Sequence, residues 1–420
     1  MSPSRVVITG LGFVTPLGND RTAVAASLRE QRHGLSPVAW FPDCPVRLAG
    51  TIRDFDVSSF NRLEWRWPAA YKIARETLRS LAPHGLYAHC ALLQAIGDAG
   101  LPPTAVTDGN MGLFCASAGS PRTLRQCLND AFDSGGQRVH PMGVVASISG
   151  TLNFNLAAAF GIRGVVTGFV SACAASTHAL GYARDEIVLG RQRRMLVVGA
   201  EEPVWESLLP FAGMRALTRQ AEPRLASRPF DRQRDGFVGA GGAVALVLEE
   251  AALAQARGAP IYAELAGWGQ CADGFSVAQS EPSGRGLAIA MRRALAEARI
   301  GAGELEYVNA HATSTPVGDA AEARALIEVL GAARPPVSSI KGLTGHPLSM
   351  AGALETALCC VAVREGFTPG NAHLVEPDEA CGDLYLPREN LATTPRTILK
   401  NSSGFGGSNV CLVLRQWPAG

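Results

Sequence analysis

The stretch "GVVTGFVSACAASTHAL" at residues 164–180 joins two kinds of secondary structure within a few residues. Its first part, 164–171, is rich in apolar and β-branched residues and predicts a buried strand. Apolar residues then recur at helical spacing over 177–189, and Gly190 lies where a helix would end. Cys173 therefore lies on a predicted turn between a strand and a helix.

Short apolar runs and helix-like stretches alternate along the rest of the chain. The runs at 5–12, 194–202 and 242–250 are typical of buried strands, and 86–100 has the pattern of a helix. This alternation favours a layered α/β fold over an all-α or all-β fold.

Two pairs of segments look alike and occur in the same order in the two halves of the chain. In each half, a strand that runs into glycines comes first, and a Gly-Phe turn followed by glycines and an apolar strand comes last. The segments are "RVVITGLGFVT" (5–15) with "IYAELAGWGQC" (261–271), and "GFVGAGGAVALVLEE" (236–250) with "GFGGSNVCLVLRQ" (404–416). Glycine-rich turns after strands also recur by chance. We nevertheless expect two units of similar plan, residues 1–255 and 256–420.

Composition excludes several classes of function. The 420 residues include 38 basic and 37 acidic side chains, so the net charge of +1 provides no general attraction for nucleic acid or an anionic membrane. No apolar run approaches the roughly 18 residues of a membrane helix. The first strand pattern begins at Val6, which leaves no room for a signal peptide. We expect a cytoplasmic protein that binds neither nucleic acid nor membrane.

The ten cysteines include no CxxC pair and no His/Cys cluster at zinc spacing, so we expect no metal site. A disulfide framework is not expected in a chain of this length without a secretory signal. Each cysteine is by default a small buried side chain. Only its context separates Cys173 from the others.

That context includes two downstream segments, "NAHATSTPVGDAAEARAL" (309–326) and "SSIKGLTGHPLSMAGALE" (338–355). They place His311, Lys341 and His346 at or after the ends of apolar strands. Helix N-terminal amides can lower the pKa of a cysteine and make it a nucleophile. Acyl chemistry needs such a nucleophile together with separate proton or hydrogen-bond donors. Lysine is rare here, since only Lys72, Lys341 and Lys400 occur.

Four segments resemble the signature blocks of the β-ketoacyl-acyl-carrier-protein synthases, closest to the elongating type I and II enzymes. They are "SACAAST" (171–177), "HATSTPVGD" (311–319), "KGLTGH" (341–346) and "NSSGFGGSN" (401–409). Further similar segments in the same order extend the resemblance over nearly the whole chain. It implies the thiolase fold, an α/β fold in which two similar halves form a five-layered αβαβα sandwich. It also implies a dimer that pairs through the strand before the nucleophile.

The resemblance implies a decarboxylative Claisen condensation. Cys173 would accept an acyl group from acyl-carrier protein, while His311 and His346 would hold the malonyl thioester carbonyl and assist loss of CO2. Lys341 would tune the charge of the cluster. The backbone amides of Cys173 and Phe405 would form an oxyanion hole.

Other matching positions would serve the substrate or the scaffold. Thr313 and Thr315 would bind the phosphopantetheine arm, and Phe405 would be a gate to which the neighbouring glycines give backbone freedom. The family binds no cofactor of its own, because the carrier protein supplies the phosphopantetheine. A brace for the cluster is implied for Asp319, Glu322 and Glu355, although Asp319 equally fits a helix-start carboxylate. His178, inside the predicted helix, is expected to be structural.

Three alternatives use the same residues. A thiolase acting on CoA thioesters requires a second cysteine where "GFGGSN" has Phe405, and a starter-condensing type III synthase has asparagine in place of His346. A non-catalytic subunit that resembles a chain-length factor lacks the cysteine. The chain keeps Cys173, His311, Lys341 and His346, which favours the condensing enzyme. The dimer could contain two identical subunits or one related partner.

Several positions depart from the family pattern. Ala312 replaces a glycine, Ser403 replaces a phenylalanine, and Pro347, Ser349 and Met350 follow His346. We hypothesise that they reshape the acyl pocket for an unusual chain, such as a polyene or polyketide intermediate, with ordinary fatty-acid synthesis as the alternative.

The segment "NRLEWRW" (61–67) resembles the family's basic docking site for the acidic carrier protein. Arg62 and Arg66 match this site, whereas Leu63 and Glu64 do not. An ordinary solvated helix face explains the segment equally well.

Overall fold

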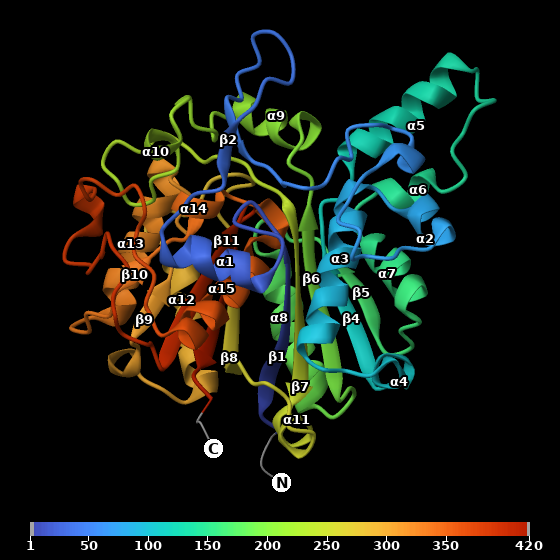
Figure 1. Cartoon of the computed structure of the whole chain (residues 1–420). Helices are drawn as coiled ribbons and strands as arrows, with labels where there is room; N and C mark the ends of the chain where they lie inside the picture. The colour runs from blue at the N-terminus through green and yellow to red at the C-terminus, as the bar shows by residue number, and fades with distance from the viewer. Residues whose placement is uncertain (1–3, 418–420) are drawn as a thin grey trace.

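The computed structural model describes residues 4–417, and ten of their strands form one hydrogen-bonded sheet (Figure 1). The strand order is β10-β9-β11-β12-β8-β1-β7-β6-β4-β5. The bounds are β1 (Val6–Val14), β4 (Met111–Ala116), β5 (Val166–Phe169), β6 (Arg194–Glu201), β7 (Gly242–Glu250), β8 (Ala263–Ala272), β9 (Tyr307–Asn309), β10 (Val337–Ser338), β11 (Thr397–Gly404) and β12 (Ser408–Arg415). A separate hairpin pairs β2 (Leu35–Pro37) with β3 (Leu48–Gly50).

The sheet consists of two runs of five strands with the same plan. In one run, β4 lies parallel between β5 and β6, and antiparallel β7 and β1 follow. In the other, β9 lies parallel between β10 and β11, and antiparallel β12 and β8 follow. Only two residue pairs, Val7–Glu264 and Ile8–Ala263, join the runs through β1 and β8. The segments that look alike in the sequence therefore occupy equivalent strands.

Helices cover both outer faces and fill the space between the two runs. α3 (Pro83–Asp98) packs outside β1 and β7, and α12 (Arg285–Ala298) packs outside β8 and β12. Between the runs lie α8 (Ala175–Val188) and α15 (Ala351–Glu365), which contact each other and strands of both runs. The layers therefore alternate as αβαβα. α15 is buried along almost its whole length, as its apolar sequence requires in a central layer.

The remaining helices connect or cover these layers. They are α1 (Arg21–Arg29), α2 (Arg75–Ser80), α4 (Pro103–Thr107), α5 (Pro121–Asp133), α6 (Gly143–Ser147), α7 (Leu152–Phe160), α9 (Trp205–Gly213), α10 (Pro223–Ala226), α11 (Ala251–Ala256), α13 (Pro316–Leu330) and α14 (Lys341–Thr344). Short 3₁₀ turns occur at Arg62–Glu64, Ala302–Glu304, Leu348–Met350 and Glu379–Cys381.

The strands and helices expected from the sequence are confirmed, with shifts at their ends. The predicted strand 164–171 is shorter, because β5 ends at Phe169 and leaves room for the turn that carries Cys173. The helix expected at 177–189 begins two residues earlier, at Ala175. Gly190 has a φ of 70°, the left-handed conformation expected just after a helix.

We propose that residues 1–255 and 256–420 are the two units of a duplicated fold. Residues 1–3 and 418–420 lie outside the described residues. The repeated strand order supports the division, because one unit would contain β1 to β7 and the other β8 to β12.

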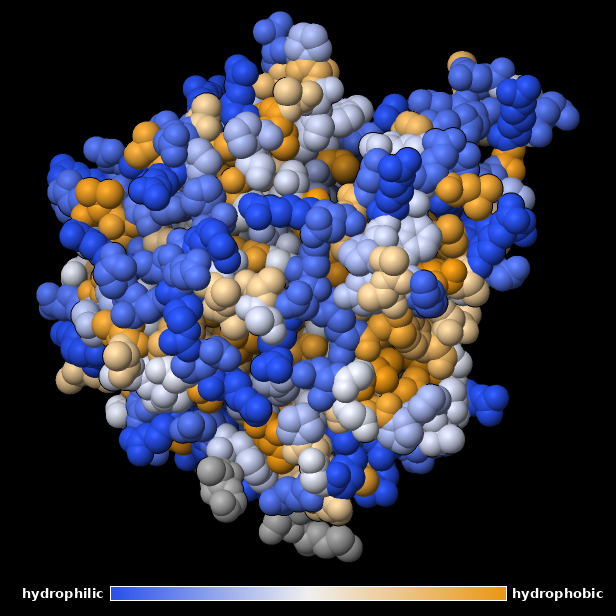
Figure 2. Space-filling view, in the orientation of Figure 1, coloured by the Kyte–Doolittle hydropathy of each residue, from blue (hydrophilic) through white to orange (hydrophobic). Residues whose placement is uncertain are grey.

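The surface is mixed in character. Figure 2 shows hydrophilic residues over most of one face, with hydrophobic residues gathered on the side where α4 and α7 lie. Within residues 4–417, no helix has both the length and the hydropathy needed to span a membrane.

Close packing of β1 on α3 gives a test of the fold. A Cβ on Gly12 would lie 1.8 Å from the Ala91 carbonyl oxygen, a backbone atom that cannot move aside. We expect Gly12→Ala to lower the free energy of unfolding by about 3 kcal/mol because the layers must separate. Thermal unfolding measures the change.

The matched control is Gly97→Ala on α3, where an added Cβ meets no atom within 4 Å. It should keep or raise stability by up to about 1 kcal/mol through helix propensity. Equal melting of the Gly12→Ala variant and the unmodified protein would contradict this packing.

Candidate active site

Cys173 lies on a strained turn between β5 and α8. The preceding residue, Ala172, has a φ of 49°, in the left-handed region that an alanine adopts only at a cost in free energy. Cys173 itself is 8% exposed and precedes the first turn of α8. The turn directs the cysteine inward, toward the central layer.

An equivalent turn precedes α15 and meets the first one. Leu348 there has a φ of 47°. The two helix starts touch: Ala353 N–H donates to Ser176 Oγ at 2.9 Å, and a Cβ on Gly352 would lie 1.9 Å from Thr177 Oγ1. Only glycine permits this approach. It brings the segment before α15, which contains His346, against the cysteine turn.

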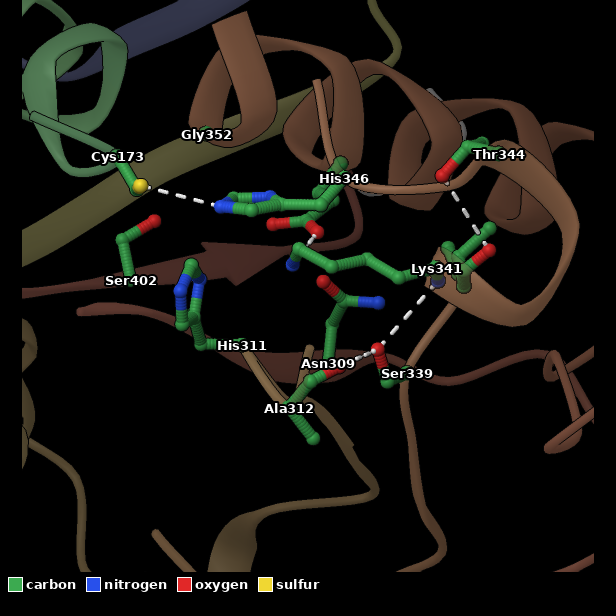
Figure 3. A network of polar contacts seen from close by, with 12 residues as sticks. Cys173, Asn309, His311, Ala312, Ser339, Lys341, Thr344, His346, Gly352 and Ser402 are labelled. Carbon is green, nitrogen blue, oxygen red and sulfur yellow. Dashed lines mark hydrogen bonds and ion pairs between the residues drawn. The ribbon is translucent and has the colours of Figure 1, made fainter. Parts of the chain in front are cut away.

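The structure brings Cys173, His311 and His346 together, as Figure 3 shows. Cys173 Sγ lies 3.0 Å from His346 Nε2. The rings of His311 and His346 meet edge to face, with their centroids 5.3 Å apart. A nucleophile and two separate imidazoles therefore share one buried space.

Glu322 on α13 holds the segment that carries His311. Its carboxylate accepts the backbone N–H groups of His311 at 2.9 Å and Ala312 at 2.7 Å, and Asn401 Nδ2 donates to it at 3.0 Å. Asp319 acts similarly one turn earlier, where it accepts the backbone N–H groups of Phe230 and Ser314. Both carboxylates therefore brace backbone, which makes Asp319 more than a helix-start charge.

Lys341 does not point at Cys173 but at a carboxylate behind the histidines. Its Nζ contacts Glu355 Oε1, and Lys400 Nζ lies 3.0 Å from Glu355 Oε2. These three side chains are at most 2% exposed. One carboxylate is thus shared by two buried ammonium groups.

Burial and these cations set the protonation of the site. Burial, followed by the charge of Lys341, lowers the pKa of both His311 and His346 well below its usual value, and Lys400 acts in the same direction. Burial raises the pKa of the Cys173 thiol to about 12, partly offset by Lys341. The resting pair is therefore a neutral thiol beside a neutral imidazole.

This overturns one expectation from the sequence. We expected the start of α8 to lower the Cys173 pKa, but desolvation outweighs that effect. The reason is the depth of the turn, which the sequence pattern does not reveal. His346 Nε2, 3.0 Å away, is placed to take the thiol proton when the sulfur reacts.

A cleft leads to Cys173, and its lining includes most of the other expected residues. Thr313 and Thr315 lie on its wall with their hydroxyl oxygens 3.1 Å apart. Phe405 also lines it, is 36% exposed, and has its ring 5.8 Å from that of Phe211. The chain after Phe405 turns through two left-handed glycines, Gly406 and Gly407.

The same turn brings β11 against the nucleophile. A Cβ on Gly404 would lie 3.1 Å from the Cys173 backbone nitrogen. The Gly404–Phe405 backbone and the Cys173 amide are therefore neighbours, which is the arrangement that an oxyanion hole made from the Cys173 and Phe405 amides requires.

The five positions that depart from the family pattern divide into two groups. Ala312 and Ser403 line the cleft, and Ser403 Oγ donates to Asn409 Oδ1 at 2.8 Å. Pro347, Ser349 and Met350 do not line the cleft, and Ser349 instead donates to Glu201. Only the first two can therefore touch a substrate in this cleft directly.

Two other sequence assignments are now clearer. His178 uses both ring nitrogens, with Ser171 Oγ at 2.8 Å and Gln270 Oε1 at 2.9 Å, so it is structural as expected. Arg62 donates to the Leu81 carbonyl oxygen and contacts His140, so it is not free for docking. Of the two arginines in that segment, Arg66 is the exposed one.

Sequence reasoning assigned no role to Lys400 or to the buried Glu201. The rarity of lysine was the available signal for Lys400, which interrupts the apolar strand pattern of β11. Among the described residues, no group of three or more His, Cys, Asp or Glu side chains could hold a metal ion.

Comparisons with known proteins agree with this geometry. The model of the β-ketoacyl synthase N-terminal domain matches residues 3–254, and that of the C-terminal domain matches 262–375. The chain is 36% identical to 3-oxoacyl-acyl-carrier-protein synthase 1 of Escherichia coli K12 over 98% of this chain and 99% of that protein.

Solved structures show the same likeness. A β-ketoacyl synthase from Burkholderia phymatum has a TM-score of 0.90 at 34% identity, covering 99% of this chain and all of the other. A type II polyketide ketosynthase, solved with its acyl-carrier protein and a bound hexaketide, has a TM-score of 0.87 at 28% identity with the same coverage.

The fold and the comparisons define a thiolase-fold acyltransferase. The chain belongs to the β-ketoacyl synthase family.

The brace under His311 gives a test of the site. We expect Glu322→Ala to lower the free energy of unfolding by about 3 kcal/mol, because it leaves two buried backbone N–H groups without an acceptor. Thermal or urea unfolding measures this.

Glu328→Ala is the control on the same helix. Its exposed ion pair with Arg292 should contribute less than about 1 kcal/mol. Equal losses in the two variants would show that the Glu322 brace carries no special stability.

Proposed function

We infer that this protein catalyses the decarboxylative condensation of an acyl group with a malonyl group carried on acyl-carrier protein. The observation that carries the inference is the contact of Cys173 Sγ with His346 Nε2, with His311 beside it in a cleft lined by threonines. The product is a β-ketoacyl-acyl-carrier protein.

The first step transfers the acyl chain. The Cys173 sulfur attacks the thioester carbonyl of the incoming acyl-carrier protein, and the thiol proton passes through His346 to the departing carrier thiol. The amides of Cys173 and Phe405 stabilise the negative charge on the carbonyl oxygen. The chain ends as a thioester on Cys173.

The second step forms the carbon–carbon bond. His311 and His346 donate hydrogen bonds to the malonyl thioester carbonyl, which stabilises the enolate left when CO2 departs. The enolate carbon attacks the Cys173 thioester, and the cysteine leaves and regains one proton. Lys341 acts from behind through Glu355, which fixes the charge around the imidazoles.

The substrates reach the site on a phosphopantetheine arm, so the proposal requires no cofactor held by the enzyme. Thr313 and Thr315 would bind the arm, and Phe405 would gate the acyl side. Acyl-carrier protein is the expected partner, and the cytoplasm is the expected location. Both fatty-acid and specialised polyketide-like chains fit the proposal, since Ala312 and Ser403 change the cleft wall.

We also propose a dimer, of two copies or of one copy with a related subunit, formed along β5. This strand is the free end of the sheet, and Val170 after it is 63% exposed. Exposed apolar side chains on α7, which contacts β5, and on α6, which contacts α7, support the proposal; they include Phe154 and Val144.

The alternatives are less well supported. A chain-length-factor-like subunit would not keep a cysteine in contact with a histidine. A thiolase would need a second cysteine where Phe405 stands, and the next one in the sequence, Cys411, is fully buried in β12.

Single variants separate the two steps. Cys173→Ser should lose acyl-enzyme formation by at least about 10³-fold, because the hydroxyl is a much weaker nucleophile here. His311→Ala should still acylate but fail to release CO2 from malonyl carrier. Radiolabelled acyl and malonyl carriers measure the two steps.

Cys127→Ser, at a half-buried cysteine that does not line the cleft, is the control and should behave as the unmodified enzyme. Uptake of labelled acyl groups by Cys173→Ser would rule out the assigned nucleophile.

Carrier docking is tested at Arg66. We expect Arg66→Glu to raise the apparent KM for carrier-bound substrate up to about fivefold at low salt, as the loss of one exposed charge contact would do. Arg334→Glu, at an exposed arginine between α13 and β10, should leave KM unchanged. If Arg66→Glu left KM unchanged, Arg66 would not belong to the docking surface.

A further inference from the structure

Lys400 is a buried cation for which the condensing mechanism above has no use. It lies on β11, where Ile398, Lys400 and Ser402 alternate with residues of the opposite face. Its side chain is fully buried in the central layer, between α8 and α15. An apolar residue is the ordinary occupant of such a position.

Its contacts tie it to the reaction centre. Lys400 Nζ lies 3.0 Å from Glu355 Oε2 and donates to the hydroxyls of Ser402 and Thr177. Those two hydroxyl oxygens are 2.7 Å apart. Thr177 belongs to the first turn of α8, and Figure 3 shows Ser402 beside Cys173. The ammonium group therefore contacts one residue in the first turn of α8 and one residue that lies beside Cys173.

The cations at Glu355 outnumber its single charge. Lys341 and Lys400 both contact this carboxylate, whereas the other buried carboxylate nearby, Glu322, is bound by backbone N–H groups and Asn401. Burial lowers the pKa of Lys400, and the charge of Glu355 opposes that shift. Burying such a charge is costly, and a well-packed apolar residue of similar volume is often neutral or more stable. Stability alone therefore does not explain Lys400.

The titratable groups around this centre come from every element packed on it. They are Glu355 and Cys359 on α15, Lys341 on α14, His346 after α14, His311 and Tyr307 from β9 and its loop, Glu322 on α13, Cys411 on β12, Glu201 on β6, and Cys173 before α8. Burial raises the pKa of Glu201 to about 7, so this carboxyl also titrates near neutrality, and the imidazoles must be observed directly to follow their protonation.

We propose that Lys400 is a positioning residue of the condensing site: with Lys341 it holds Glu355 between two ammonium groups, and its positive charge adds to burial and Lys341 in keeping His311 and His346 neutral. The charge of Lys400 lowers the pKa of both imidazoles. The role of the imidazoles in condensation rests on the proposed function, whereas their protonation does not.

Neutral imidazoles suit the chemistry for two reasons. His346 must be neutral to accept the proton of the Cys173 thiol. A protonated imidazole would also stabilise the malonyl carboxylate before CO2 leaves, which raises the barrier to decarboxylation.

The experiment replaces Lys400 with methionine, which has similar length and no charge. Removing the cation should raise the imidazole pKa values, so His311 and His346 should protonate about 1 pH unit higher than in the unmodified protein. NMR of the histidine Cε1–H groups, assigned with His311→Ala and His346→Ala, measures this without any substrate. Lys72→Met, at another of the three lysines, should change neither imidazole.

A second readout follows activity. The acid limb of kcat/KM for condensation should move to higher pH by the same amount, while the unfolding temperature stays equal or rises. A merely structural role would instead lower the unfolding temperature and leave the pH profile in place.

Unchanged imidazole midpoints in Lys400→Met would overturn the proposal, and so would failure of both Lys400→Met and Lys400→Gln to fold. If only one of these variants folds, the protonation midpoints of its two imidazoles decide whether the proposal holds. Absence of condensation by the unmodified protein would count against the proposed function alone, because the NMR midpoints do not depend on turnover.

Discussion

The contact between the starts of α8 and α15 is the constraint on which the site depends. The two helices belong to equivalent positions in the two runs of the sheet, and Gly352 lets their first turns touch at Thr177. Residues more than a hundred positions apart, Cys173 and His346, thereby come within 3.0 Å. The left-handed residues Ala172 and Leu348, one in each turn, carry backbone strain that this packing must maintain.

The charges behind the histidines form a second layer of organisation. Glu322 holds the backbone that carries His311, while Glu355 is held between Lys341 and Lys400. Neighbouring residues of β11 serve both carboxylates from opposite faces of the strand, since Asn401 contacts Glu322 and Lys400 contacts Glu355. The end of β11 therefore positions both carboxylates that support the site.

The sequence predicted the layered fold, the repeated strands and the residues that the structure gathers around Cys173, because each depends on local pattern or on a family motif. It did not predict the properties that depend on how deeply a side chain is buried. The raised pKa of Cys173 follows from its burial. Arg62 turns inward and donates to the Leu81 carbonyl oxygen, a packing contact that the basic residues of the segment alone do not predict. Lys400 was visible only as a rare residue in an apolar strand, because its partner Glu355 lies 45 positions earlier in the sequence.

A single-turnover experiment tests the central claim most directly. The protein is acylated with an acyl-carrier thioester, freed of carrier, and then mixed with malonyl-acyl-carrier protein, while mass spectrometry follows the peptide that contains Cys173. The account predicts that the acyl mass first appears on Cys173 and then disappears as CO2 and β-ketoacyl carrier form in equal amounts. An acyl mass on another residue, or one that remains on Cys173 after malonyl carrier is added, would contradict it.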